Sequence, residues 1–216
     1  MLGTPYASVL AAVREYLTIV RTLLDSGAAE FDGEYFSCHA AMNPAVFPRI
    51  DLGLGVLRPG MARLAGEIAD VAITWLTPAA YLEGTVLPAM RQAAQKAGRP
   101  TPRLASIVPV ALSHPDREAA EMVLASNSAH MRAPHYIDML RRAGIDFVED
   151  DLPLSAKRMA EGGAFVHGDM DSVLEQLAKY RESGVDEIIL NLTGVYNVHG
   201  PKAAMGDLKK ILAAVA

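Results

Sequence analysis

Cysteine, long apolar runs and excess positive charge are all scarce in this chain of 216 residues. The single cysteine, Cys38, excludes an internal disulfide and a cysteine-based zinc cluster. No apolar run approaches the roughly 20 residues of a membrane-spanning helix, and Met1–Pro5 lacks the basic and apolar regions of a signal peptide. Twenty Lys and Arg against 25 Asp and Glu give a net charge of −5, which argues against a nucleic-acid partner because phosphates require a basic face. These features favour a cytoplasmic protein that binds neither membranes nor nucleic acids.

Apolar residues are plentiful instead. They make up 51% of the chain, against 21% charged residues, which is typical of a folded protein with a large core. We see neither a low-complexity stretch nor a linker. We therefore expect a single domain over residues 1–216.

Helix and strand patterns alternate along the chain. Hydrophobic spacing and breaker residues predict helices at 6–24, 59–70, 79–97, 169–183 and 201–215, with two or three more within 116–161. Strands are predicted at 49–56, 71–76, 103–112 and 185–192, a short one at 164–167, a small hairpin at 30–36 and a loop at 37–48. Pro109 is awkward inside a central strand and favours a bulge or a strand end there.

This alternation implies an α/β fold, with a parallel sheet and outer helices. A complete (β/α)8 TIM-type barrel needs about 250 residues and eight strands. Four clear strands and one weak one predict either an incomplete barrel that lacks its first strands or an open α/β sheet.

The central part of the chain resembles a known family. Residues 57–70, Leu-Arg-Pro-Gly-Met-Ala-Arg-Leu-Ala-Gly-Glu-Ile-Ala-Asp, and Ile73-Thr74-Trp75-Leu76 are similar to the luciferase-like monooxygenase superfamily. Leu87-Pro88-Ala89, Ala97-Gly98-Arg99-Pro100 and Val108-Pro109-Val110 resemble its deazaflavin branch. Residues 14–17 look like the helix after the family's fourth strand, and 184–190 look like its eighth strand. The variable stretch at 113–165 corresponds to a helical insertion.

The resemblance implies hydride transfer between coenzyme F420 (an 8-hydroxy-5-deazaflavin) and an unknown small organic substrate. An FMN-dependent monooxygenase is a nearer alternative. The family's first four strands carry the residues credited with substrate protonation, and the chain begins after them, so no catalytic residue is assigned. It is expected to be a fragment, a natural short form or half of a split pair. Non-catalytic alternatives are a remnant or a partner subunit.

Missing strands would leave a parallel edge and the inner strand faces uncovered. We therefore expect the chain to form a homodimer or to pair with a second chain through the open side.

The first candidate site is the turn at Gly55, Leu57, Arg58, Pro59, Gly60 and Met61. A helix N-terminus offers free N–H groups, glycine lets a phosphate approach the backbone, and Arg58 adds charge. In the family this turn holds the coenzyme phosphate. The alternative is an ordinary strand-to-helix turn.

The second candidate is Thr74 with Trp75, at the carboxyl end of a strand, where barrels bind ligands. The Thr74 hydroxyl is expected to contact a phosphate, and Trp75 is expected to wall a ring system, unless it is simply a core residue. Some deazaflavin enzymes place a lysine after this strand, but here Pro78 and Ala79 follow.

Other polar clusters have simpler interpretations. His130, Arg132, His135 and Tyr136 lie in the insertion that covers the substrate mouth in relatives, but their spacing matches no metal site or triad and favours a solvated helical hairpin. His39 beside Cys38 is expected in a surface loop. Asp169 is expected to cap a helix, and adjacent Asp186 and Glu187 point to opposite faces of a strand. No metal site is predicted.

Overall fold

The computed structural model describes residues 6–43 and 48–215. Its strands are β1 (Ala28–Asp32), β2 (Ser37–Ala41), β3 (Gly53–Gly55), β4 (Val71–Trp75), β5 (Arg103–Leu112), β6 (Val166–Gly168) and β7 (Glu187–Asn191). The α-helices are α1 (Val9–Ser26), α2 (Pro59–Ile68), α3 (Ala79–Tyr81), α4 (Leu87–Lys96), α5 (Ala119–Asn127), α6 (Pro134–Arg142), α7 (Leu152–Glu161), α8 (Met170–Glu182) and α9 (Thr193–Val215). A π-helix, η1 (Leu82–Val86), joins α3 to α4, and a 3₁₀ turn, η2 (His130–Arg132), precedes α6.

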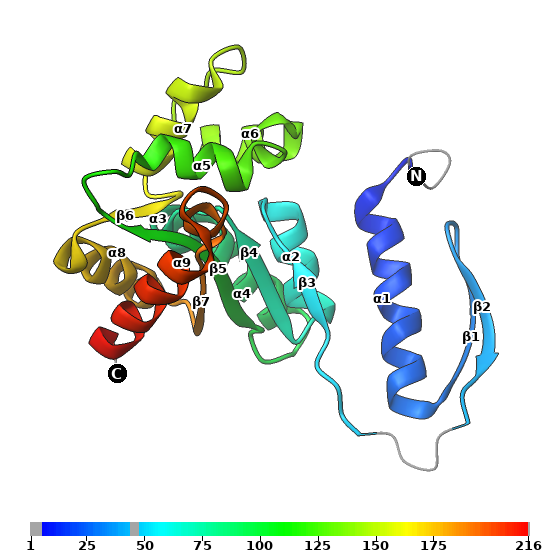
Figure 1. Cartoon of the computed structure of the whole chain (residues 1–216). Helices are drawn as coiled ribbons and strands as arrows, with labels where there is room; N and C mark the ends of the chain where they lie inside the picture. The colour runs from blue at the N-terminus through cyan, green and yellow to red at the C-terminus, as the bar shows by residue number, and fades with distance from the viewer. Residues whose placement is uncertain (1–5, 44–47, 216) are drawn as a thin grey trace.

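Five strands form one parallel sheet in the order β3-β4-β5-β6, with β7 also paired to β5. The predicted strands are confirmed, and helices flank the sheet as Figure 1 shows. Within residues 6–43 and 48–215 no pairing joins β3 to β7, so these strands do not close a barrel. The expectation of a bulge or a strand end at Pro109 is wrong, because Pro109 lies inside β5 in register with Asn191 of β7. The residues paired with β4 end two positions earlier, at Ile107, so Pro109 needs no N–H for the pairing with β4.

Local capping explains where several helices begin. Pro59 occupies the first turn of α2, where a missing N–H costs nothing. The Asp169 side chain accepts a hydrogen bond from the Ser172 N–H and starts α8, as predicted. Capping also explains where α1 ends. Gly27, directly after its last residue, adopts a left-handed conformation with φ of 77°.

Two segments differ from the sequence predictions. β2 lies at Ser37–Ala41, in the range expected to be a loop, because β1 offers an antiparallel partner whose backbone bonds do not depend on a hydrophobic pattern. The segment 44–47 of the same expected loop, with the breaker Pro44, lies outside the described residues. α9 begins at Thr193 rather than near 201, since two helical pieces meet at Gly200, whose φ is 81°.

None of the helices in the described part of the chain is both long and apolar enough to cross a membrane. The helices α5, α6 and α7 lie within the expected insertion at 113–165 and stand together beyond one end of the sheet in Figure 1.

The two faces of the sheet are covered very differently. Ala72, Leu104 and Val108 are at most 1% exposed and face the helices. Residues one position away point to the opposite face. This second face, called here the inner face, carries Val71, Ile73, Ile107 and Ile189. The first three are half-buried and Ile189 is 40% exposed, so the inner face is an apolar surface that is only partly covered.

Asp70 joins the helical N-terminal part to the sheet. Its side chain is only 12% exposed, and its carboxylate is 3.1 Å from Arg21, 3.1 Å from Arg49 and 3.6 Å from Arg99. It also accepts a 2.9 Å hydrogen bond from the Leu52 N–H. Because these partners come from α1, from the approach to β3 and from the segment after α4, one carboxylate ties together three parts of the chain.

We expect Asp70→Asn to lower the free energy of unfolding by about 3 kcal/mol, since it leaves three clustered arginines without their shared partner. Chemical denaturation measures the change. Asp25→Asn is the matched control, because Asp25 is 57% exposed and pairs only with Arg21, so its loss should cost less than about 1 kcal/mol. Equal destabilisation by the two variants would contradict this role for Asp70.

We also propose that the inner face associates with a second copy of this chain. Arg103 and Glu187 lie 3.8 Å apart beside its apolar residues, so two copies can place opposite charges against each other. Light scattering should then give a mass above the 23.1 kDa of one chain. Ile189→Lys should reduce the mass, whereas Met205→Lys, on the equally accessible surface of α9, should not. A mass of 23.1 kDa at high protein concentration would refute the association.

Candidate functional site

A cleft of about 580 Å³ lies at the carboxyl end of β3 and the start of α2. Its lining consists of Val9, Leu10, Gly55, Leu57, Arg58, Gly60, Met61 and His135. Five of these are residues of the first site predicted from the sequence. The volume is in the range of small-molecule sites, and most of the lining is apolar.

The start of α2 is suited to an anion. Arg58 stands at the N-cap but makes no side-chain capping bond, and the first turn holds no acidic residue. The first N–H groups of a helix have no partner within the helix, and the helix dipole is positive there. A Cβ added at Gly55 would meet no atom within 4 Å, so the backbone is open to a ligand at that position. The predicted turn therefore combines free N–H groups, a positive side chain and a backbone that a ligand can approach.

The insertion supplies the negative charge that the first turn of α2 lacks. Asp138, on α6, lies 3.2 Å from Arg58 and 3.0 Å from Arg142. Burial by itself would raise the pKa of Asp138, but hydrogen bonds from Arg142 and Arg58 lower it overall, so the carboxylate is held ionised. An ion pair thus connects the insertion to the cleft across 80 positions of sequence.

Tyr81 lies close to this charged group. It is 5% exposed, and its hydroxyl is buried without a hydrogen-bond partner. Burial raises the pKa of Tyr81, and the charges of Arg142, Asp138 and Arg58 also act on it. A buried hydroxyl without a partner is costly, but Tyr81 is not among the residues that line the cleft.

A row of rings runs from the cleft to the end of β4. The ring centroids of His135 and Tyr136 are 4.9 Å apart, those of Tyr136 and His130 are 4.9 Å apart, and those of His130 and Trp75 are 5.8 Å apart. Both Trp75 Nε1 and His130 Nδ1 are buried without a hydrogen-bond partner. The expectation of a merely solvated hairpin is therefore wrong for His130, because η2 packs it against the sheet.

The backbone turns sharply directly after Trp75. Leu76 has φ of 58°, the left-handed region that side chains other than glycine rarely occupy, and is 1% exposed. Burial of its side chain in the core offsets the conformational cost. The Thr77 hydroxyl then donates to the Trp75 carbonyl at 3.1 Å, and the Thr77 carbonyl accepts from the Tyr180 hydroxyl at 3.1 Å. This turn fixes Trp75 at the edge of the sheet, and no local sequence pattern indicated it.

Thr74 does not lie where the sequence predicted. It is fully buried, it points to the helix-covered face, and its hydroxyl bonds the Ser106 hydroxyl at 3.0 Å. The alternation of side chains along a strand places Trp75 and Thr74 on opposite faces. Trp75 is not among the residues that line the cleft, and it is connected to His135, which does line it, through the rings of His130 and Tyr136.

The remaining candidates have structural partners. His39 lies 2.6 Å from Glu30 and 3.0 Å from Asp32, and hydrogen bonds to these two carboxylates raise its pKa. It points away from Cys38, its neighbour on β2, rather than activating it. Asp186 accepts from the Leu104 N–H, and Glu187 lies near Arg103. In the described part of the chain, no cluster of three or more potential ligands could hold a metal ion.

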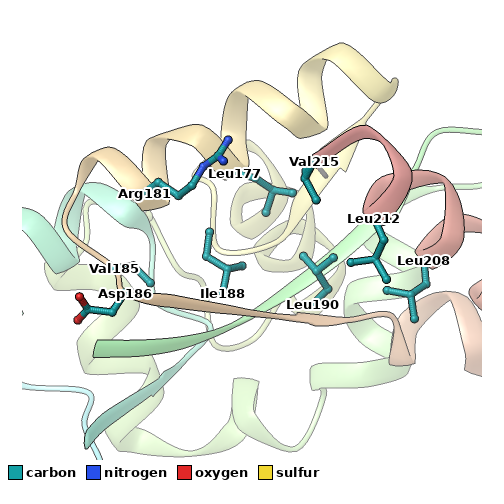
Figure 2. A pocket seen from close by; sticks show the side chains of 9 residues that line it. All are labelled: Leu177, Arg181, Val185, Asp186, Ile188, Leu190, Leu208, Leu212 and Val215. Atoms are coloured by element: carbon teal, nitrogen blue, oxygen red, sulfur yellow. The ribbon is translucent and has the colours of Figure 1, made fainter. Parts of the chain in front are cut away.

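A second hollow of about 360 Å³ lies between α8, β7 and the end of α9 (Figure 2). Its walls are mainly apolar, including Leu177, Ile188, Leu190 and Leu212. Its single carboxylate, Asp186, is occupied by a backbone bond. It offers no group for acid–base chemistry, so the cleft at α2 is the better candidate site.

The carboxyl ends of parallel strands are where both (β/α)8 barrels and open α/β sheets bind their ligands. The family described as luciferase-like monooxygenase matches residues 1–187, and the chain belongs to this family.

Three individual proteins are similar to it. An F420-dependent glucose-6-phosphate dehydrogenase from Nakamurella multipartita is 26% identical over 197 residues, which are 85% of this chain and 55% of the relative. An F420-dependent secondary alcohol dehydrogenase, solved with an F420–acetone adduct, has a TM-score of 0.71 at 17% identity, covering 100% of this chain and 65% of that one. The F420-dependent tetrahydromethanopterin reductase from Methanopyrus kandleri has a TM-score of 0.68 at 19% identity, covering 95% and 66%. The chain thus spans between about half and two thirds of the length of these proteins.

Burial lowers the pKa of His130, and the charge of His135 lowers it further. In the unfolded chain His130 should titrate near the ordinary value of 6.5, so its contribution to stability is complete above that pH and is lost as the pH falls toward the lower folded value. Trp75 is the only tryptophan, so we expect its emission to change with a midpoint below pH 6.5.

His130→Gln should remove this transition, whereas His39→Gln, in the β1–β2 hairpin, should leave it intact. Persistence of the transition in His130→Gln would show that another group causes it.

Proposed function

We propose that this chain forms the coenzyme-binding part of an oxidoreductase that transfers a hydride between coenzyme F420 and a small organic substrate. The observation that carries the proposal is the start of α2, where free N–H groups, Arg58 and an open Gly55 lie at one end of the cleft. Membership of the luciferase-like family and the F420-dependence of the similar proteins support it.

The residues present fit such a coenzyme. The N–H groups of Gly60 and Met61, in the first turn of α2, and the guanidinium of Arg58 would hold its phosphate. Leu57, Met61 and Leu10 supply apolar walls that exclude water from the site. When bound, the deazaflavin supplies the hydride chemistry, and the protein supplies binding and orientation.

Groups suited to acid–base chemistry are few in the cleft. Among the described residues that line the cleft, His135 is the only histidine, the residue type that most often serves as a general acid or base. Its position on the insertion, beside Tyr136, suits contact with substrate better than contact with the phosphate end. Hydride transfer by this chain therefore requires that the residues lining the cleft hold the substrate as well as the coenzyme.

Two alternatives remain distinct from this proposal. An FMN-dependent monooxygenase would use the same phosphate site with a different ring system. A non-catalytic partner subunit would bind neither coenzyme.

We place the protein in the cytoplasm, which is consistent with its single cysteine.

Titration with coenzyme F420, followed by coenzyme fluorescence, tests the proposal. The wild-type chain should bind, and Arg58→Gln should weaken binding about tenfold because a charge-assisted hydrogen bond to the phosphate is lost. Arg63→Gln is the matched control, since Arg63 is an exposed arginine of the same helix that does not line the cleft.

A parallel titration with FMN separates the two coenzymes, and bound coenzyme in the purified protein would absorb near ~420 nm or ~450 nm accordingly. Flat titrations with both would favour the non-catalytic subunit.

A further inference from the structure

We propose that the hollow between α8, β7 and α9 binds a medium-length aliphatic carboxylate, with its alkyl chain in the hollow and its carboxylate on Arg181. The hollow lies in the helix layer and shares no lining residue with the cleft at α2. The inference is therefore independent of the proposed function, and it adds a second class of ligand.

Aliphatic side chains from three elements form the walls of the hollow. They come from α8 (Leu177), from β7 (Ile188 and Leu190) and from α9 (Leu208 and Leu212). Figure 2 shows Ile188 and Leu190 pointing from the strand toward the two helices. Leu212 is 50% exposed, so hydrocarbon that fills the hollow would remove apolar surface from water.

The size of the hollow favours a single alkyl chain over a protein segment. Its volume is about 360 Å³, near the lower end of the range for small-molecule sites. One turn of an α-helix, about 10 Å wide and about 5.4 Å long, occupies roughly 400 Å³ by itself. A partner helix would therefore insert only its side chains, whereas an extended alkyl chain fits between the walls.

Arg181 is the only positively charged residue among the described residues that line the hollow. It takes part in none of the ion pairs in the described part of the chain, whereas Lys179, on the same helix, lies 2.9 Å from Glu175. Asp186, the one carboxylate in the lining, accepts from the Leu104 N–H at 2.7 Å, and Figure 2 shows it pointing away from Arg181. An unpaired guanidinium beside hydrocarbon walls is complementary to an alkyl carboxylate.

Calorimetric titration with decanoate, below its micelle concentration and at constant ionic strength, tests the inference. We expect saturable binding of one decanoate per chain, with a negative heat-capacity change because apolar surface is buried. From hexanoate to octanoate the affinity should rise roughly fifteenfold, which is about fourfold for each methylene group.

Arg181→Gln tests the contact with the carboxylate. It should weaken decanoate binding about tenfold, because a charge-assisted hydrogen bond is lost, and it should leave the binding of decanol unchanged. Lys179→Gln is the matched control, since Lys179 is a cation of the same helix that does not line the hollow. Equal losses in the two variants would show that decanoate responds only to the general charge of α8, and would overturn the inference.

Leu212→Glu tests the walls. The half-exposed position tolerates a polar side chain, but a charge in the wall should abolish decanoate binding. Met205→Glu is the matched control, because Met205 is also 50% exposed on α9 and does not line the hollow. In the wild type, decanoate should also slow hydrogen exchange of the amides of residues 208–215.

Three further results would overturn the inference. The first is the absence of saturable decanoate binding, and the second is unchanged binding in Leu212→Glu. The third is a mass above one chain that Leu212→Glu, but not Met205→Glu, returns to 23.1 kDa, since a second copy would then fill the hollow. None of these measurements involves coenzyme F420, so failure of coenzyme binding would count against the proposed function alone.

Discussion

Backbone pairing along β5 is the interaction on which the rest of the structure depends. Residues 103–107 pair with β4, 105–109 with β7 and 110–112 with β6, all in parallel. Because parallel strands present their carboxyl ends at one edge, this pairing brings the end of β4 and, through β4, the end of β3 beside the insertion. The cleft at α2 exists because these ends are aligned, and the apolar helix-facing side of β5 keeps them so.

Charge at the cleft is divided between distant parts of the chain. α2 starts without an acidic residue and exposes positive potential, while Asp138 on the insertion neutralises Arg58. This arrangement leaves the helix N-terminus free for a ligand and places α6 beside it. α6 itself is held by core packing, since Ile137, Met139 and Leu140 are at most 5% exposed, and the half-exposed ion pair adds a contact between the insertion and the start of α2.

Strong local signals explain what could be predicted. The apolar runs of β4 and β5, Pro59 at the start of α2 and Asp169 at the start of α8 each depend on neighbours in sequence, and each prediction is confirmed. β2 and the first part of α9 were missed because their stability comes from a paired strand and from packing on α5, which short-range patterns do not register. The turn at Gly55 to Met61 was predicted as a candidate site from its glycines, proline and arginine, and five of its residues line one cleft.

The sequence by itself determined the α/β class, the order of elements and the turn at residues 55–61, since periodicity and capping act over a few positions. Only the tertiary structure decided that Thr74 faces the helices, that Trp75 meets His130, and that Asp138 faces Arg58. Each of these depends on the direction of a side chain from its strand or helix. That direction places groups from distant segments within a few ångströms, and no local pattern records it.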